Sequence, residues 1–185
     1  FLNNTLSAKQ LELLRDLLPA VTTIGVLADA TNPAALSALI DVQAAARALG
    51  VRVIVANAAT EQDIDASFAT LVQQRAGAVL SLGASLFTSR RQQIIALVTR
   101  HALPAIYDTR DYVAAGGLMS YGSSVTDGYR QAGIYAGRIL GGANPADLPV
   151  VQGTRVELVI NLGTARSLGL SIPPTLLARA DEMIE

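Results

Sequence analysis

Tyrosine and acidic side chains follow two short apolar runs in the middle of the chain. The run 105–107 ends in Tyr107 and is followed by Asp108, and the run 118–121 ends in Tyr121. An aspartate can accept hydrogen bonds from a ligand's ammonium group, and tyrosine rings can cover its apolar part. No acid–base pair accompanies them, so these residue types predict that a small molecule is held rather than transformed.

The same residues also have a structural interpretation. Asp108 or Thr109 could cap a short helix predicted over 110–115, and Arg110 could pair with a neighbouring carboxylate at the surface. Both interpretations stay open for any single residue, because strand ends serve both purposes. For the strand ends taken together, ligand binding is the favoured interpretation.

Motifs of other function classes are absent or incomplete. The first strand-to-helix turn, 29–33, contains no glycine that would admit a pyrophosphate. The run 83–87 resembles a nucleophile elbow, but Phe87 stands where the second glycine is required. His101 is the only histidine and there is no cysteine, so we expect no metal, no cofactor and no catalytic residue.

Composition narrows the class of protein. With 51% hydrophobic and 16% charged residues, the 185-residue chain can bury a large core as one domain or slightly more. A formal charge of −1 without a basic run argues against nucleic acid as a partner. No apolar stretch reaches the ~18–20 residues of a membrane span.

Alternating strands and helices position the polar residues. Apolar, β-rich runs are each followed by a segment with helical periodicity, which predicts strands over 22–28, 51–56, 78–82, 105–107 and 118–121. This order predicts an α/β fold, with an open parallel sheet and helices on both faces, as in flavodoxin-like and Rossmann-like domains. The residues after the strands would then gather at one edge of the sheet.

Helices and one further strand complete the prediction. A first helix is expected over 8–18, with Ser7 as its N-cap. Residues 124–140 form one long helix whose apolar positions recur at helical spacing. A sixth strand is expected over 155–162, and Pro173-Pro174 opens a last helix that extends to Ile184.

Several strings resemble a known family. They are Ser7–Pro19, Leu103–Tyr107, Ala115–Gly122, Tyr129–Gly133, Glu157–Asn161 and Pro173–Asp181. They are similar to segments of ABC-transporter substrate-binding proteins of the tryptophan/tyrosine type, and the resemblance covers nearly the whole chain. It implies a type I periplasmic binding fold in a periplasmic or otherwise extracytoplasmic protein. Such a protein closes two lobes on a small ligand, an aromatic amino acid in some members, and docks on a membrane permease.

The resemblance also implies a division of the chain and a set of contact residues. Residues 1–20 would be the incoming hinge and first helix, 21–122 the ligand-binding lobe, 123–152 a helix and connector, and 153–185 a returning strand and C-terminal helix. The family is longer than this chain, so an upstream lobe is expected. The residues implied to face the ligand are Thr31, Asn32, Ala84, Ser85, Tyr107, Asp108 and, at the crossover between the lobes, Tyr121.

The helical periodicity of residues 124–140 and the family resemblance together predict how this helix is covered. In such proteins the helix at 124–140 packs on the other lobe, so its apolar stripe has no partner in this chain. A stripe of that length should not stay in water. We therefore expect it to pack on the upstream lobe or on a second copy, as a homodimer or by a helix swap.

Two other classes remain as alternatives. The first is the ligand-sensing domain of a transcriptional regulator, which shares the fold. The second is a small α/β enzyme, which would need a base near Ser85 or Asp108, whereas the only histidine lies elsewhere.

Overall fold

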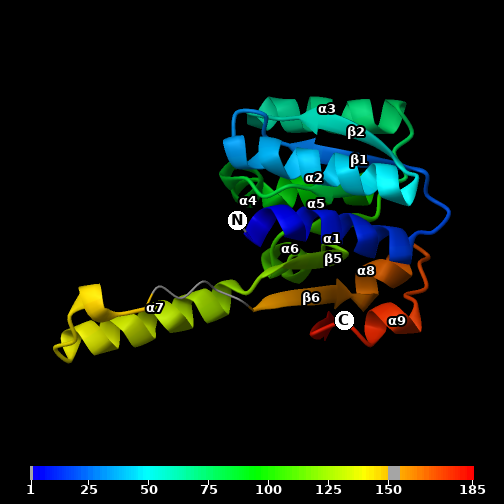
Figure 1. The fold of residues 1–185 in the computed structure, drawn as a ribbon. Coiled ribbons are helices and arrows are strands. Elements are labelled where there is room, and N and C mark those ends of the chain that lie inside the picture. Colours follow the sequence, from blue (N-terminus) through cyan, green and yellow to red (C-terminus); the bar gives the residue numbers. More distant parts are fainter. Residues whose placement is uncertain (1, 150–154) are drawn as a thin grey trace.

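The computed structural model describes residues 2–149 and 155–185, and these residues build a seven-stranded sheet in the order β2-β1-β3-β4-β5-β6-β7 (Figure 1). The strands are β1 (Thr23–Ala28), β2 (Arg52–Asn57), β3 (Ala78–Ser81), β4 (Ala105–Tyr107), β5 (Met119–Ser123), β6 (Val156–Asn161) and β7 (Glu182–Ile184). The pairs from β2 to β5 are parallel, β6 runs antiparallel to β5, and β7 is parallel to β6. The predicted α/β class is confirmed, and the sheet is mostly parallel.

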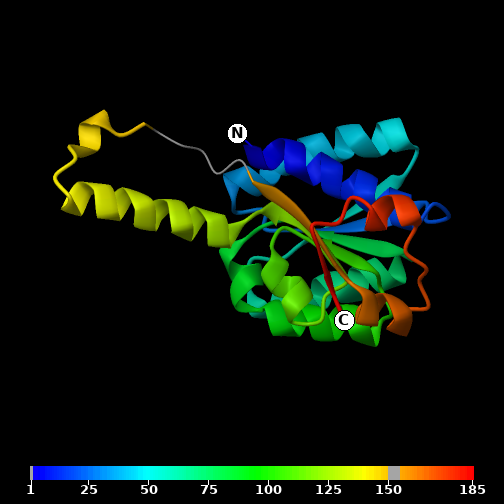
Figure 2. The ribbon, with the colours of Figure 1, turned by 90° about the horizontal axis from the view of Figure 1, so that it is seen from below.

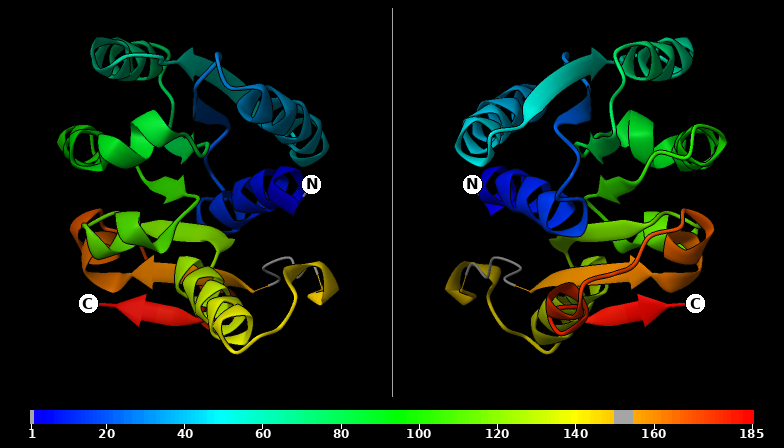
Figure 3. Two further views of the ribbon diagram at one scale, coloured as in Figure 1. Left: turned by 90° about the vertical axis from the view of Figure 1, so that its left-hand side faces the viewer. Right: turned by 90° about the vertical axis from the view of Figure 1, so that its right-hand side faces the viewer.

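Helices cover both faces of the sheet (Figure 3). On one face, α1 (Leu2–Leu17) and α2 (Pro33–Leu49) pack against each other. The opposite face carries α3 (Glu61–Gln73), α4 (Ser85–Ser89), α5 (Arg91–Arg100) and α6 (Arg110–Ala114). Two short helices, α8 (Leu162–Ser167) and α9 (Pro174–Leu177), connect β6 to β7. The first helix is therefore part of the same layered unit as the sheet.

The core lies in two layers, one on each face of the sheet. Leu14, Val26 and Val42 belong to the layer under α1 and α2, whereas Leu27 and Phe68 belong to the layer under α3 to α6. Adjacent residues of β1 thus enter opposite layers, as side chains of a strand must. This explains why the run 22–28 is apolar throughout instead of alternating.

The helix ends follow the local sequence. Asn32 Oδ1 accepts a hydrogen bond from the Ala34 N–H at the start of α2, where Pro33 is the first helical residue. Gly50 closes α2 with φ of +66°, a conformation that glycine adopts at no steric cost. At α3, Thr60 Oγ1 accepts from the Asp63 N–H (3.3 Å), while the Asp63 carboxylate accepts from the Thr60 N–H (2.9 Å). These reciprocal bonds form a capping box.

We expect Thr60→Ala to lower the free energy of unfolding by about 1 kcal/mol, because the Asp63 N–H loses its acceptor. The Thr60 side chain, followed by the backbone N–H groups of Ala59 and Thr60, also stabilises the Asp63 carboxylate and holds its pKa below the ordinary value. Urea unfolding at neutral pH measures the effect. Thr70→Ala, further along α3, is the control and should stay within about 0.5 kcal/mol of the parent protein; equal losses for both variants would contradict the capping role.

Three predicted element boundaries are wrong. Helix α1 begins at Leu2, so Ser7 is an interior, buried residue and not an N-cap. The sequence predicts one helix that follows the turn 83–85 and ends near His101, but the structure divides this segment into α4 and α5 at Arg90. The last helix ends at Leu177 instead of Ile184. There, Asp181 exchanges two hydrogen bonds with the backbone of Leu158, and these bonds lead the chain into β7.

Helix α7 (Val125–Leu140) projects away from the sheet (Figures 1 and 2). Its N-cap is Ser124, as the predicted bounds require, and a short 3₁₀ turn, η1 (Pro145–Asp147), follows it. No α7 residue is buried, and its exposed large apolar side chains are Val125, Tyr129, Ile134, Ile139 and Leu140. The predicted helix with an uncovered apolar face is therefore present.

Parts of the predicted division fall outside the described residues, namely Phe1 of the hinge, 150–152 of the connector and 153–154 of the returning segment. Within the described part, no helix combines the length and the apolar character that crossing a membrane requires.

Candidate functional site

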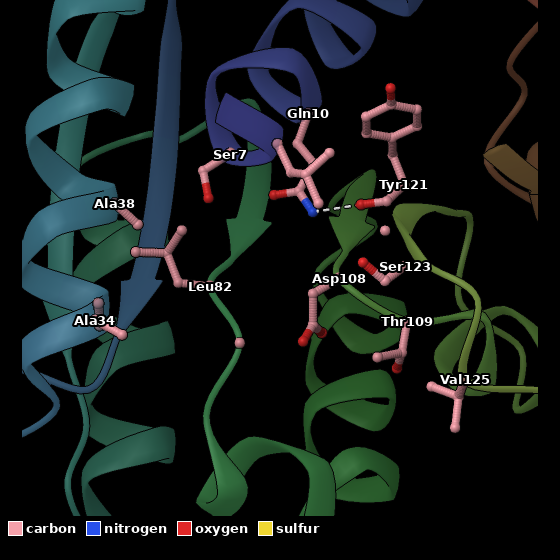
Figure 4. A pocket seen from close by; sticks show the side chains of 14 residues that line it. Ser7, Gln10, Ala34, Ala38, Leu82, Asp108, Thr109, Tyr121, Ser123 and Val125 are labelled. Atoms are coloured by element: carbon pink, nitrogen blue, oxygen red, sulfur yellow. Dashed lines mark hydrogen bonds between the residues drawn. The ribbon is translucent and has the colours of Figure 1, made fainter. Parts of the chain in front are cut away.

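A cavity of about 230 Å³ opens where β3, β4 and β5 end (Figure 4). It is lined by the N-terminal half of α1, the first turns of α2 and the loops that follow the strands. Its residues are Leu6, Ser7, Gln10, Ala34, Ala35, Ala38, Leu82, Gly83, Asp108, Thr109, Tyr121, Gly122, Ser123 and Val125. The cavity thus lies at the sheet edge where the sequence predicted ligand contacts.

Asp108 is the only charged residue among the described residues that line this cavity. Burial raises the pKa of its carboxyl group above the ordinary value, and a hydrogen bond from its own backbone N–H opposes that shift. No basic side chain of the described residues forms an ion pair with it. A desolvated carboxylate without a cation is costly, so this arrangement favours a cation that arrives with a ligand.

Two glycines allow the neighbouring loops to approach Asp108 closely. A Cβ atom placed on Gly83 would lie 2.5 Å from Asp108 Oδ2, and one on Gly122 would lie 1.7 Å from the Asp108 carbonyl oxygen. Both distances are far below van der Waals contact. Asp108 is therefore enclosed by the ends of β3 and β5, and a side chain at either glycine would displace it.

Gln10 attaches α1 to the floor of the cavity. Its Nε2 group donates to the Tyr121 carbonyl (2.6 Å) and, with a longer bond, to the Tyr107 carbonyl (3.4 Å). Figure 4 shows the amide nitrogen directed at Tyr121 and the amide oxygen directed the opposite way. The residue is 3% exposed, so α1 and the ends of β4 and β5 are held together by a buried polar contact.

The structure brings only some of the predicted contact residues to the cavity. Asp108 and Tyr121 line it. Thr31, Asn32 and Ala84, on the adjoining loops, and Ser85, the first residue of α4, do not line it. The polar groups of the first two are already engaged, since the Thr31 hydroxyl donates to Asp29 (2.6 Å) and the Asn32 side chain caps α2.

Tyr107 presents its side chain to the opposite face of the sheet. Its ring is fully buried in the layer under α5 and stacks on Tyr112 with ring centroids 4.3 Å apart. Ile106, one residue earlier, belongs to the layer under α1. Because strand side chains alternate between faces, the tyrosine that ends β4 cannot point toward α1 and the cavity. It contributes only its backbone carbonyl to that region.

Tyr107→Phe should leave ligand binding unchanged and keep or slightly raise the free energy of unfolding. Its hydroxyl is buried without a hydrogen-bond partner among the described residues, and that burial raises its pKa. Tyr112→Phe is the matched control, because it removes a hydrogen bond with Thr88 and should cost about 1 kcal/mol. Denaturant unfolding of both variants checks this; a larger loss for Tyr107→Phe would show that its hydroxyl has a partner.

Sequence reasoning missed Ser7 and Gln10. A signal was present, because both are polar residues at helical spacing on the leucine-rich side of α1, where Leu14 and Leu17 follow. A buried polar residue on an apolar helix face needs a hydrogen-bond partner. Three further lining residues were also missed: Thr109, which lies after β4, Ser123, the last residue of β5, and Val125, which lies after β5.

The cavity carries a single charged side chain, Asp108, and lies at the carboxyl ends of parallel strands, which is where open α/β domains hold small ligands. Within the described residues, no cluster of three or more histidine, aspartate or glutamate side chains could hold a metal ion. Residues 2–184 match the family described as ABC transporter substrate binding protein, and the chain belongs to that family.

Solved structures agree with this assignment. A conserved domain protein from Vibrio cholerae is 26% identical, with a TM-score of 0.81 over 96% of this chain and 60% of its own. The ABC domain from Streptococcus pneumonia, solved in complex with L-Trp, is 25% identical, with a TM-score of 0.83 over 97% of this chain and 62% of its own. This chain thus spans about three fifths of the length of both structures. No protein with a curated description matches the chain.

Proposed function

We propose that this chain holds a small solute with an ammonium group, such as an amino acid, for an ABC uptake transporter, and that it does so without chemical transformation. The observation that carries the proposal is Asp108, a partly buried carboxylate with no basic partner among the described residues, in a cavity otherwise lined by neutral side chains. A charge-assisted hydrogen bond from an ammonium group would satisfy it.

The walls of the cavity fit the rest of such a solute. Ala34 and Ala38, with only a methyl group each, and Gly83, with no side chain, leave room for a ligand's carbon skeleton. The first turn of α2 adds the positive end of a helix dipole, which favours a carboxylate nearby. The structure of the relative with L-Trp supports an amino acid as the ligand class.

The exposed face of α7 supports a two-lobed arrangement. We propose that a second lobe or a second copy of the chain covers Val125, Tyr129 and Leu140 and completes the site above the cavity. Docking on a permease and an extracytoplasmic location belong to the same proposal. Sedimentation at increasing concentration tests the self-association arm, and a monomer at every concentration would exclude it.

The ligand class is tested by NMR titration of this chain with the twenty amino acids, which detects even millimolar affinity. L-Tryptophan is compared with indole-3-propionate, which has the same ring but no ammonium group. We expect shifts of Asp108 and its neighbours with an amino acid and not with the deaminated compound. Binding of neutral metabolites only, with no response to any amino acid, would reject the ammonium-bearing solute and favour the regulator alternative.

A further inference from the structure

A second cavity, of about 300 Å³, lies on the other face of the sheet from the first cavity, which contains Asp108. It is bounded by the second half of α5, the start of β4, the residues just before β5, and α8. Its apolar side chains include Val98, Leu103, Ala105 and Leu168. None of the described residues that line it is charged. The second cavity therefore suits a neutral, largely hydrocarbon molecule, because a charged group would be desolvated there without a counter-ion.

Tyr107 lines the second cavity from the end of β4, and its ring leans back along the strand. The strand register places Tyr107 opposite Ser120, three residues beyond Gly117, which is roughly 10 Å along a strand. Yet a Cβ atom placed on Gly117 would lie only 2.7 Å from Tyr107 Cε2, the ring carbon next to the one that carries the hydroxyl group. Gly116 and Leu118, on either side of Gly117, both line the cavity. The hydroxyl end of the ring therefore lies at the cavity wall.

The Tyr107 hydroxyl has an unused capacity for hydrogen bonding. It is buried and has no partner in the described part of the chain. Two other hydroxyl groups at the wall have already donated their protons. Thr164 Oγ1 donates to the Gly116 carbonyl (2.9 Å), and Ser167 Oγ donates to the Gly163 carbonyl (3.0 Å). A buried hydroxyl without a partner is costly, and an oxygen atom of a ligand at this wall would remove that cost.

We propose that the second cavity binds a small neutral molecule that is mostly hydrocarbon and carries one carbonyl or hydroxyl oxygen, which accepts a hydrogen bond from Tyr107. An apolar protein cavity of about 150 Å³ holds benzene, so about 300 Å³ suits a molecule of two fused rings. Such a ligand differs in charge from the ammonium-bearing solute of the first cavity. The proposal does not rest on the function proposed above.

The test uses two bicyclic probes of nearly equal size, the ketone 1-indanone and the hydrocarbon indane, in NMR titrations of this chain. We expect 1-indanone to shift the methyl signals of Ile95, Val98 and Leu168 and to give intermolecular NOEs to them. It should bind about three- to tenfold more tightly than indane, the effect of one hydrogen bond. No response to 1-indanone up to its solubility limit, or equal affinity for the two probes, would overturn the proposal.

A pair of variants assigns the hydrogen bond. Tyr107→Phe should weaken binding of 1-indanone about three- to tenfold and leave binding of indane unchanged. Ser120→Ala is the matched control, because Ser120 lies opposite Tyr107 and its hydroxyl is likewise buried and unpartnered within residues 2–149 and 155–185, but it does not line the cavity. It should change neither affinity. An equal loss in Ser120→Ala, or weaker binding of both probes to Tyr107→Phe, would contradict the role of Tyr107.

Ser167→Leu tests the location without touching Tyr107. Ser167 is an exposed residue of α8 that lines the second cavity, so a leucine side chain there would fill part of its opening. We expect both probes to lose their binding, and unaltered binding would overturn the proposal. L-Tryptophan, added as a competitor, should not displace 1-indanone. Displacement would place the ketone in the first cavity and would also overturn the proposal.

Discussion

Asp108→Asn should make the free protein more stable at pH 7. Burial raises the pKa of this carboxyl group above its unfolded value of 3.8, so ionisation opposes folding. The penalty is absent well below pH 3.8, grows as the pH rises through the raised pKa, and is constant above it. Asparagine keeps the shape without the charge. Thermal unfolding at pH 7 and at pH 3 should therefore show a gain only at pH 7.

The same substitution should weaken binding of an ammonium-bearing solute about 10- to 100-fold, because a hydrogen bond to a charged group is lost. Asp111→Asn is the control, since this neighbouring carboxylate is 61% exposed and faces Arg91. It should change neither the stability nor the affinity appreciably. A less stable Asp108→Asn protein at pH 7, or one with parent-like affinity, would contradict the role given to this group. The expected trade of stability for binding is typical of functional sites.

Gly122→Ala should destabilise the protein by about 3 kcal/mol or more, at the upper end for overpacked positions. The new methyl group would lie 1.7 Å from the Asp108 carbonyl oxygen, and a backbone atom cannot rotate away as a side chain can. Because Gly122 also pairs with Glu157 across β5 and β6, relief of the clash must disturb the sheet. The free energy of unfolding in urea measures the loss.

Gly133→Ala is the opposite case on the same chain. Nothing lies within 4 Å of the Cβ position of Gly133, in the middle of α7, so alanine should stabilise the helix by about 0.5–1 kcal/mol. Equal effects of the two substitutions would show that the close approach of Asp108 to β5 is absent in solution.

The strands could be predicted because parallel strands covered on both faces are apolar throughout, as β1 and β3 are. The starts of α2 and α3 could also be predicted, because their capping residues, Asn32 and Thr60, directly precede the first helical turn. β7 could not be predicted, because a strand of three residues is too short to show a periodicity. Its position depends on the contact of Asp181 with β6.

The cavity lies at the edge of the sheet where the ligand contacts were predicted, and two of the seven predicted residues, Asp108 and Tyr121, line it. Asp108 could be named because its position after β4 follows from the alternation of strands and helices. Tyr107 was misplaced because residue type does not reveal which face of the sheet a strand-end side chain takes. Gln10 stands out in the sequence as a polar residue on the apolar side of α1, but its partner Tyr121 lies more than a hundred positions away, and no local pattern encodes that contact.

The ends of β5 and β6 meet where α7 departs from the sheet. The Ser124 N–H donates to the Arg155 carbonyl (2.9 Å), directly beyond the paired residues Ser123 and Val156. Residues 125–154 are therefore an insertion into what would otherwise be a tight β-hairpin. The entropy of closing a loop rises only with the logarithm of its length, so each doubling costs roughly 0.6 kcal/mol. Evolution could lengthen, shorten or replace this insertion without altering the strand register that holds Asp108 and Gly122 together.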